Sequence, residues 1–352
     1  MTITHRMMMR VAMVATVLVT IYSFLYMPAV VNYILKPKRL NILAWPNEMN
    51  SEFLKDFEKK TGVTVYLSFF DSVEEMAVKM STGGHDYDLI MVSDYATKTL
   101  IENNLVKPID KKRLTFWQDL YPTLLGIYCD PKNEYTIPYS WDVFGIGIDT
   151  SFFKDGLPEA SWDLLFGKSK SPGLVGMLDN AREVTSIVAL YLFGTSKNLS
   201  ADQLNQIGSL LVTQKAWVSM YTNWRIDFLL LSQTTPVAMA LSSHIKRAMK
   251  ESEHIEFLVP KEGSFLVVDS FLISAQSQNE DHIYEFLNYL YQPDILQKYI
   301  NRFNFLSASQ KVQSDDDHSL MRPTKKLLSQ VQFFRHKLPE TRMRELWISL
   351  KS

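Results

Sequence analysis

Polar and apolar positions repeat along this chain with two different periods. Apolar side chains at every second position predict a strand over residues 63–69. Before it, residues 51–61 place three apolar side chains on one face of a helix. Asn50 stands where it would cap the start of that helix, and Gly62 stands where it would end it. The two patterns together predict a helix that packs on a sheet.

Short apolar runs without alternation predict strands that are buried on both faces. They occupy residues 40–45, 87–92 and 265–268. Predicted strands and helices follow one another at short spacing in the first part of the body, which is typical of a parallel sheet covered by helices on both faces. The rhythm changes near 135–148, where an extended segment leads into a second α/β unit that continues to about residue 263.

The N-terminal 35 residues differ from the rest of the chain. Arg6 and Arg10 precede the segment 11–35, which has 25 residues and no formal charge. A basic flank before a long apolar segment is typical of a secretory signal, and its charge would direct the following body outward. We therefore expect residues 1–35 to be a signal peptide or an N-terminal membrane anchor. Their length and the scarcity of small residues for cleavage favour the uncleaved anchor over a cleaved peptide, and both over a buried helix.

Composition narrows the class of the remaining body. The chain has 352 residues, 46% hydrophobic and 21% charged, which is globular and leaves room for two domains. Its 37 basic and 38 acidic residues give a net charge of −1, so electrostatic binding of nucleic acid is not expected. A single cysteine, Cys129, excludes intrachain disulfides and cysteine-based zinc sites, and it suits an exported body in a bacterial periplasm.

Common catalytic and metal-binding motifs are missing from the sequence. It contains no Gly-x-Ser-x-Gly, no His-Glu-x-x-His and no phosphate-binding loop of the Gly-x-x-x-x-Gly-Lys type. The seven histidines are scattered singly, which disfavours a metal site. Asp86 and Asp88, at the entry of a predicted strand, are interpreted as solvated acids. We expect no enzyme activity, no metal and no cofactor.

Aromatic and polar residues that directly follow predicted strands are the candidate binding residues. Trp45 and Asn47 follow one strand, and Ser93 and Tyr95 follow another. Ligands of open parallel sheets bind beyond the carboxyl ends of the strands, and a binding site needs apolar surface with a few hydrogen-bonding groups. From spacing alone, Trp45 and Tyr95 fit equally well as packing residues, so both interpretations stay open.

An ordered series of motifs resembles the periplasmic spermidine/putrescine-binding proteins of ABC importers. The series stays collinear from about residue 39 to 310, and its matching segments are 40–45, 57–63, 87–95, 137–141, 161–165, 179–184, 259–263 and 269–270. Its most specific parts are Asn180-Ala181-Arg182-Glu183-Val184 and Pro260-Lys261-Glu262-Gly263. The resemblance implies an α/β, two-lobe periplasmic binding protein fold (type II), in which hinge strands connect the lobes and the ligand binds in the cleft between them.

The resemblance also implies how the chain is divided. Residues 38–140 plus 267–312 would form lobe 1, and residues 141–266 plus 313–352 would form lobe 2. The first passage between the lobes then falls near Tyr139–Trp141, where the polar and apolar rhythm changes.

Motif positions imply which residues bind the ligand. A polyamine carries ammonium groups on methylene spacers, so its site needs carboxylates and aromatic faces. Trp45 and Tyr95 would stack on the chain, Glu183 and Asp269 would pair with ammonium groups, and Ser93 would supply a hydrogen bond. The full implied lining is Trp45, Asn47, Ser93, Tyr95, Asn180, Glu183, Leu241, Val267, Asp269 and Phe305.

Five of these positions depart from the family pattern. The family has acids where Asn47 and Asn180 stand, tryptophans near Leu241 and Val267, and a tyrosine in place of Phe305. Fewer carboxylates weaken the attraction that offsets dehydration of an ammonium group, and fewer large rings widen the site. The neighbouring carboxylates available to replace the missing charge are Asp94, Asp179 and Glu48.

The preferred hypothesis is a monomeric periplasmic protein that captures a polyamine-like cation and delivers it to an ABC permease in the cytoplasmic membrane. An uncleaved N-terminal segment would tether it to that membrane. Two alternatives remain at this point: the same fold binding a neutral, anionic or less charged solute, and a membrane-tethered sensor that has lost uptake.

Overall fold

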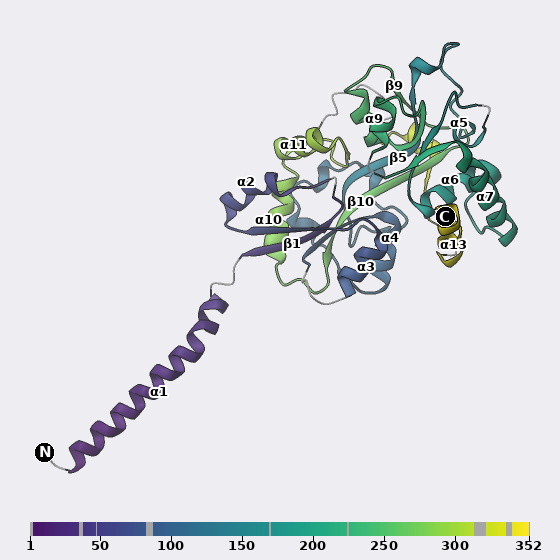
Figure 1. The fold of residues 1–352 in the computed structure, drawn as a ribbon. Helices are drawn as coiled ribbons and strands as arrows, with labels where there is room; N and C mark the ends of the chain where they lie inside the picture. The colour runs from purple at the N-terminus through teal and green to yellow at the C-terminus, as the bar shows by residue number, and fades with distance from the viewer. Residues whose placement is uncertain are drawn as a thin grey trace.

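An α/β body and one protruding helix make up the computed structural model of this protein. α1 (Ile3–Ile34) stands away from the body, and its side chains from Val11 to Met27 are exposed (Figure 1). A search of the described part of the chain finds no helix with the length and hydropathy of a membrane span. The leader or anchor over residues 1–35 stays a prediction. The structure describes residues 3–34, 38–46, 48–81, 87–168, 170–223, 225–312, 322–335 and 340–351.

The first half of the body is a sheet covered by helices on both faces, as the alternation of strands and helices predicted. β1 (Arg39–Ala44) pairs in parallel with β2 (Thr64–Phe69) and β3 (Leu89–Ser93). Alternate residues of β1 and β3 enter two different cores, because successive side chains point to opposite faces. The covering helices are α2 (Ser51–Thr61), α3 (Val73–Ser81), α4 (Asp94–Glu102), α10 (Glu280–Leu290) and α11 (Pro293–Phe303).

The caps predicted for α2 are both present. The backbone N–H of Phe53 donates to Asn50 Oδ1 at 3.3 Å, and Gly62 follows the helix at φ 71°, in the left-handed region. Glycine adopts that conformation without the clash that a Cβ causes. Local sequence signals therefore set both ends of this helix.

Two long strands cross from one half of the body to the other. β5 (Ile137–Asp149) and β10 (Ser264–Ser274) pair antiparallel and are buried along their whole length. β10 also pairs with β3, whereas the end of β5 pairs with β8 (Val237–Leu241) and β9 (Ile255–Leu258). The halves therefore share one continuous path of strands, β2-β1-β3-β10-β5-β8-β6-β7, through the middle of the body (Figure 1).

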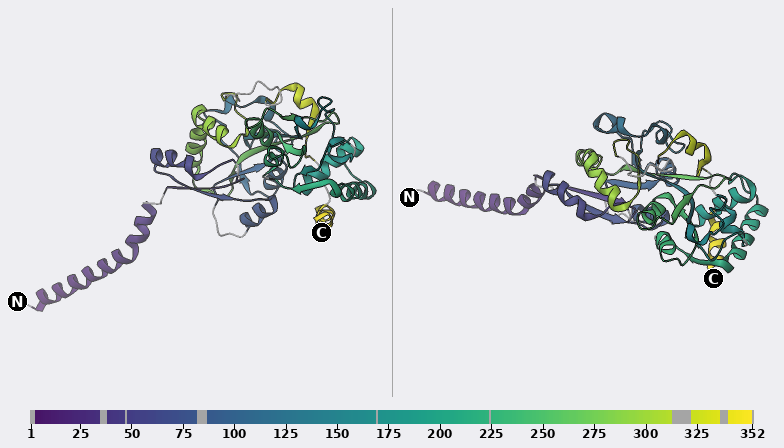
Figure 2. Two further views of the ribbon diagram at one scale, coloured as in Figure 1. Left: turned by 45° about the horizontal axis from the view of Figure 1, so that its top comes forward. Right: turned by 90° about the horizontal axis from the view of Figure 1, so that it is seen from above.

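The second half is built on β8 and two further parallel strands, β6 (Val175–Met177) and β7 (Val218–Tyr221). Its helices, which surround these strands (Figure 2), are α5 (Asp163–Phe166), α6 (Ala181–Phe193), α7 (Ala201–Gln214), α8 (Ile226–Leu231), α9 (Ser242–Met249) and α13 (Glu340–Lys351). The remaining elements are β4 (Val106–Lys107), β11 (Leu306–Ser307), α12 (Lys325–Gln330) and β12 (Val331–Phe333). The residue limits given above for the two lobes stay a prediction.

Asp88 is buried, which corrects its interpretation as a solvated acid. Only 2% of the residue is exposed. Its carboxylate accepts hydrogen bonds from the backbone N–H of Asn41 at 2.9 Å, Ser277 Oγ at 2.6 Å and Asn279 Nδ2 at 3.1 Å. Asp88 thereby joins β1 to the segment before α10, because a buried carboxylate needs such donors. Asp86 lies outside the described residues.

Gly145 lies on β5 against β9, and its substitution tests the packing of these two strands. A Cβ at this position would lie 2.5 Å from Phe257 Cζ and 2.6 Å from the carbonyl oxygen of Leu258. The second contact is backbone and cannot rotate away, so we expect Gly145→Ala to cost about 2 kcal/mol of stability. A lower midpoint of thermal unfolding checks this. Gly173→Ala, whose Cβ would meet only Pro236 at 3.2 Å, is the control, and equal losses in both variants would contradict the prediction.

Candidate ligand-binding cleft

A cleft of about 820 Å³ lies between the two halves of the body. The ends of β1 and β3 line it from one half, the start of α6 and the end of β8 line it from the other, and the crossing strands contribute from both. Asn47 lies outside the described residues. Every other candidate lines the cleft: Trp45, Ser93, Tyr95, Asn180, Glu183, Leu241, Val267, Asp269 and Phe305. The structure therefore brings these residues together, while their role in binding stays a prediction.

Asp269 is held in the cleft by the strand next to its own. Sheet register places it opposite Ser93, and Ser93 Oγ donates to Asp269 Oδ1 at 2.5 Å. The Ser93 hydroxyl is thus already used to position a carboxylate, whereas the sequence assigned its hydrogen bond to the ligand. Burial raises the pKa of Asp269 to about 6, the hydrogen bond from Ser93 opposes that rise, and the charge of Asp142 adds to it.

Glu48 brings a second carboxyl group to Asp269. Its Oε2 accepts from Ser140 Oγ at 2.6 Å, and Ser140 lies opposite Asp269 in the register of β5 and β10. Burial raises the pKa of Glu48 well above its ordinary value, and the charge of Asp269 raises it further. Sequence reasoning named Glu48 only as a neighbouring acid, since nothing in the sequence showed where its side chain points.

Asp142 and Glu183 also bring carboxyl groups to the cleft. Asp142 accepts from Ser242 Oγ at 2.6 Å and from both the backbone N–H and Oγ of Ser243 at 2.7 Å, so it caps the start of α9. Burial raises the pKa of Asp142. Burial, together with the charge of Asp269, raises the pKa of Glu183 to about 8, and Arg182 opposes the shift. Acids that resist ionisation in this way favour a cation beside them.

Trp45 and Tyr95 pack on neighbouring rings and also face the cleft, and their role in ligand binding stays a prediction. The Trp45 ring packs on Phe70 with centroids 4.2 Å apart, and the Tyr95 ring meets Phe334 edge-on at 6.2 Å. Both rings also line the cleft and are partly exposed. The Trp45 N–H helps to lower the pKa of Asp269, although its geometry is too poor for a regular hydrogen bond. Phe305, by contrast, is 2% exposed and offers little surface.

Asn180 has a structural task that a ligand contact would have to share. Its Oδ1 accepts from the backbone N–H groups of Arg182 at 3.1 Å and Glu183 at 3.2 Å. Asn180 is therefore the N-cap of α6. This cap fixes the first turn of the helix and with it the direction in which Glu183 enters the cleft.

The other two carboxylates named as replacements are already engaged. Trp347 Nε1 donates to Asp179 Oδ1 at 3.0 Å, and Lys351 forms an ion pair with the same carboxylate. Asp94 is 1% exposed, it accepts from the backbone N–H of Val268 at 3.1 Å, and it does not line the cleft. Burial raises the pKa of Asp94 to about 7. Glu48, by contrast, lines the cleft and is held by Ser140, the residue opposite Asp269 in the sheet.

Sequence reasoning missed several residues of the cleft wall. His244 is buried, and burial lowers its pKa to about 4, so it is neutral. Arg247 Nε donates to Asp227 at 2.6 Å. The C-terminal helix α13 also reaches the cleft, with Trp347 among its lining residues. No local sequence pattern predicts these contacts, because they join segments that are far apart in the chain. Among the described residues, no three His, Cys, Asp or Glu side chains are grouped to hold a metal ion.

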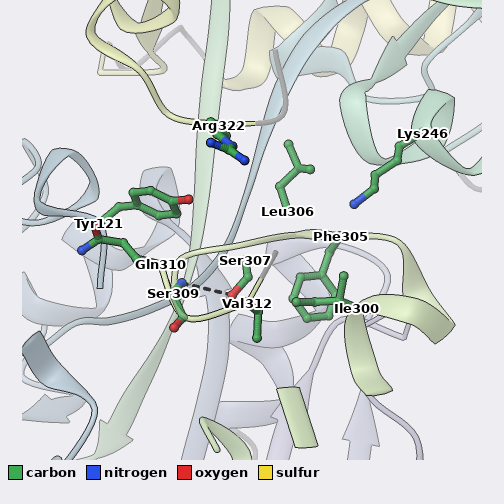
Figure 3. A pocket seen from close by; sticks show the side chains of 10 residues that line it. All are labelled: Tyr121, Lys246, Ile300, Phe305, Leu306, Ser307, Ser309, Gln310, Val312 and Arg322. Atoms are coloured by element: carbon green, nitrogen blue, oxygen red, sulfur yellow. Dashed lines mark hydrogen bonds between the residues drawn. The ribbon is translucent and has the colours of Figure 1, made fainter. Parts of the chain in front are cut away.

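A second pocket of about 290 Å³ lies beside β11 (Figure 3). Lys246 and Arg322 line one side, and Ser307, whose Oγ accepts from the backbone N–H of Ser309 at 3.0 Å, lies on the other. Among the described residues that line this pocket, two are cationic and none is acidic, a composition that repels amines. A cationic ligand therefore fits the larger cleft.

Comparisons with known proteins agree with this architecture. A putative spermidine/putrescine ABC transporter from Listeria monocytogenes has a TM-score of 0.80 at 24% identity, and covers 89% of this chain and 99% of its own. The substrate-binding protein PotD from Streptococcus pneumoniae has a TM-score of 0.74 at 22% identity, with 89% and 98% covered. The fold is the two-lobe periplasmic binding protein fold (type II), as predicted.

The sequence comparisons place the chain in a family. Residues 52–322 match the model of the bacterial extracellular solute-binding proteins. The putrescine-binding periplasmic protein PotF of Escherichia coli is 30% identical over 277 residues, which are 74% of this chain and 75% of that protein. The putrescine/agmatine-binding protein of Pseudomonas aeruginosa is 25% identical over 77% of this chain and 78% of its own. The chain belongs to the bacterial extracellular solute-binding proteins.

Proposed function

We propose that this protein captures a polyamine-like cation of the putrescine class outside the cytoplasmic membrane and delivers it to the permease of an ABC importer. The observation that carries the proposal is the gathering of four carboxyl groups, those of Glu48, Asp142, Glu183 and Asp269, in one cleft beside two aromatic rings. Burial raises the pKa of each of the four, so a cation that binds beside them would favour their ionised forms.

The shape and chemistry of the cleft suit a linear diamine. Its volume of about 820 Å³ exceeds what such a small molecule needs, so closure of the two lobes would bring the walls onto the ligand. The carboxylates then pair with ammonium groups, while Trp45 and Tyr95 cover the methylene chain and attract its charged ends. The curated relatives described above are named for putrescine and for putrescine and agmatine, which supports this class of ligand.

The departures from the family pattern widen the cleft and replace two expected acids by asparagines, while other carboxyl groups keep the cleft acidic. Leu241 and Val267 are smaller than the rings expected there, so they widen the site. Glu48 supplies a carboxyl group that the motif positions did not imply. A site that is wide and still acidic supports binding of an amine rather than of a neutral sugar.

Location and partners follow the same proposal. The protein works in the periplasm as a monomer, and its liganded, closed form is the one that a permease recognises. Residues 1–35 direct the body across the membrane and tether it there. Deleting the gene tests the transport role. Loss of putrescine uptake supports it, whereas unchanged uptake, when the purified protein does bind putrescine, favours a sensor.

A thermal-shift screen tests the ligand class. We expect putrescine, cadaverine, agmatine or spermidine to raise the unfolding midpoint by several degrees, because a ligand that binds only the folded state stabilises it. Amino acids and sugars are expected to leave the midpoint unchanged. Stabilisation by sugars or amino acids alone would contradict the proposed polyamine ligand.

A further inference from the structure

Glu48 and Asp269 form a pair of carboxyl groups whose arrangement is built by four separate segments. Glu48 follows β1, and Asp269 lies in the middle of β10. Ser140 Oγ donates to Glu48 at 2.6 Å, and Ser93 Oγ donates to Asp269 at 2.5 Å. Each hydroxyl occupies one oxygen of a carboxyl group. Ser140, which holds Glu48, lies opposite Asp269 in the register of β5 and β10, so the two carboxyl groups are neighbours.

Two neighbouring acids that are shielded from water resist ionising together, because their negative charges repel each other. One of the two therefore keeps its proton until a cation arrives. Ser140 and Ser93 each have a single hydroxyl proton, and both are already directed at these acids. The unliganded pair therefore holds one proton and one negative charge.

Other acids around this pair also favour its protonated form, because their negative charges oppose a further ionisation. Asp142 on β5 and Glu183 on α6 also line the cleft. The charge of Asp142 raises the pKa of Asp269, and the charge of Asp269 raises the pKa of Glu183. Asp94, Tyr95, Tyr139 and Tyr291 also interact with one member of the pair. The basic groups nearby act on the neighbouring acids or line the wall: Arg182, His244, Lys246 and Arg247.

We propose that one ammonium group of the ligand replaces the proton shared by Glu48 and Asp269, so that capture of the amine releases a proton to the solvent. This inference rests on the proposed function. The exchange balances in charge and in atoms: the protonated pair and the ammonium group become an ion-paired ammonium between two carboxylates, and the proton goes to the buffer. Ser140 and Ser93 then keep their hydrogen bonds, since both already point at carboxyl oxygens.

Coupling of this kind makes the affinity depend on pH. Because the bound form holds fewer protons than the free form, binding strengthens as pH rises and weakens as pH falls. One released proton corresponds to about a tenfold gain in affinity per pH unit while the pair stays protonated in the free protein.

Isothermal titration of putrescine into the full-length protein tests the proposal. Heats measured at pH 7 in phosphate and in Tris differ by the ionisation enthalpies of the buffers, which gives the number of protons released. Glu48→Gln removes the shared proton, so it is expected to reduce that number by about one relative to wild type. Glu159→Gln is the matched control: Glu159 pairs on the surface with Lys261, and its removal should change nothing.

The outcomes separate this inference from the function on which it rests. Putrescine binding with no proton release, or with equal release from wild type and Glu48→Gln, overturns the shared proton and leaves the amine ligand in place. Absence of binding by any amine overturns both. Should Glu48→Gln fail to fold, the wild-type protein still tests the proposal. A putrescine affinity that does not change between pH 6 and pH 8 would contradict the proton exchange.

Discussion

Asp269→Asn is expected to lower the affinity for putrescine about 100-fold, because the variant keeps the shape of the side chain and removes its charge. An ammonium group desolvated beside a neutral amide loses the ion pair that offsets its dehydration, and truncating one partner of a buried charge pair costs several kcal/mol. Ser93 already holds this side chain at 2.5 Å, so the loss of charge is not compensated by movement. Titration calorimetry at pH 7.5 measures the change.

Asp281→Asn is the control for this variant. Asp281 is 93% exposed and pairs with Arg113 on the surface, where ion pairs contribute little. We expect its affinity for putrescine to match wild type within about twofold. Unchanged affinity in Asp269→Asn as well would remove Asp269 from the binding site and with it the central contact of the proposed function.

The fold was predictable from sequence because its signals are local or periodic. Asn50 and Gly62 set the two ends of α2 through contacts within one helical turn. In β1, Ile42 and Leu43 enter different cores for the same reason that neighbouring strand residues point to opposite faces. β5 was less clear, since its 13 residues are buried along their whole length and show no alternation.

The candidate site was predictable only in part. Residues that lie in sequence motifs could be named in advance, whereas contacts between residues far apart in the chain could not. Trp45, Ser93 and Asp269 lie at strand positions that the family motifs mark, and all three line the cleft. The engagement of Asp179 by Lys351 joins residues 172 positions apart, and no pattern around either residue indicates it. The direction of Glu48 is set by Ser140, which the sequence did not connect with it.

Hydrogen bonds give two residues of the cleft tasks that the sequence did not predict. Ser93 was expected to bind the ligand, but its hydroxyl holds Asp269. Asn180, which stands where the family has an acid, caps α6 and thereby orients Glu183. Such tasks depend on which partner a polar group finds in the folded chain, and residue type alone leaves that choice open.

Glu183→Gln is expected to change stability and binding in opposite directions. Glu183 has a pKa of about 8 in the folded protein against an ordinary value of 4.5, so its raised pKa contributes stability that is fully present below pH 4.5 and lost as pH rises toward 8. A glutamine has no charge to bury, so the unliganded variant at pH 8 should unfold about 5 °C higher than wild type. The same change should weaken putrescine binding at least tenfold, roughly the loss of one charged hydrogen bond.

Thermal unfolding at pH 5 and pH 8, with and without putrescine, measures both effects. The gain in midpoint from Glu183→Gln should be small at pH 5, where most of the Glu183 population is protonated in the folded protein, and large at pH 8. Saturating putrescine should raise the wild-type midpoint at pH 8 more than that of the variant, since only wild type offers the carboxylate. A variant that is less stable than wild type at pH 8, or that binds putrescine more tightly, would contradict this role of Glu183. It would show that the ionised carboxylate neither destabilises the free protein nor binds the ammonium group.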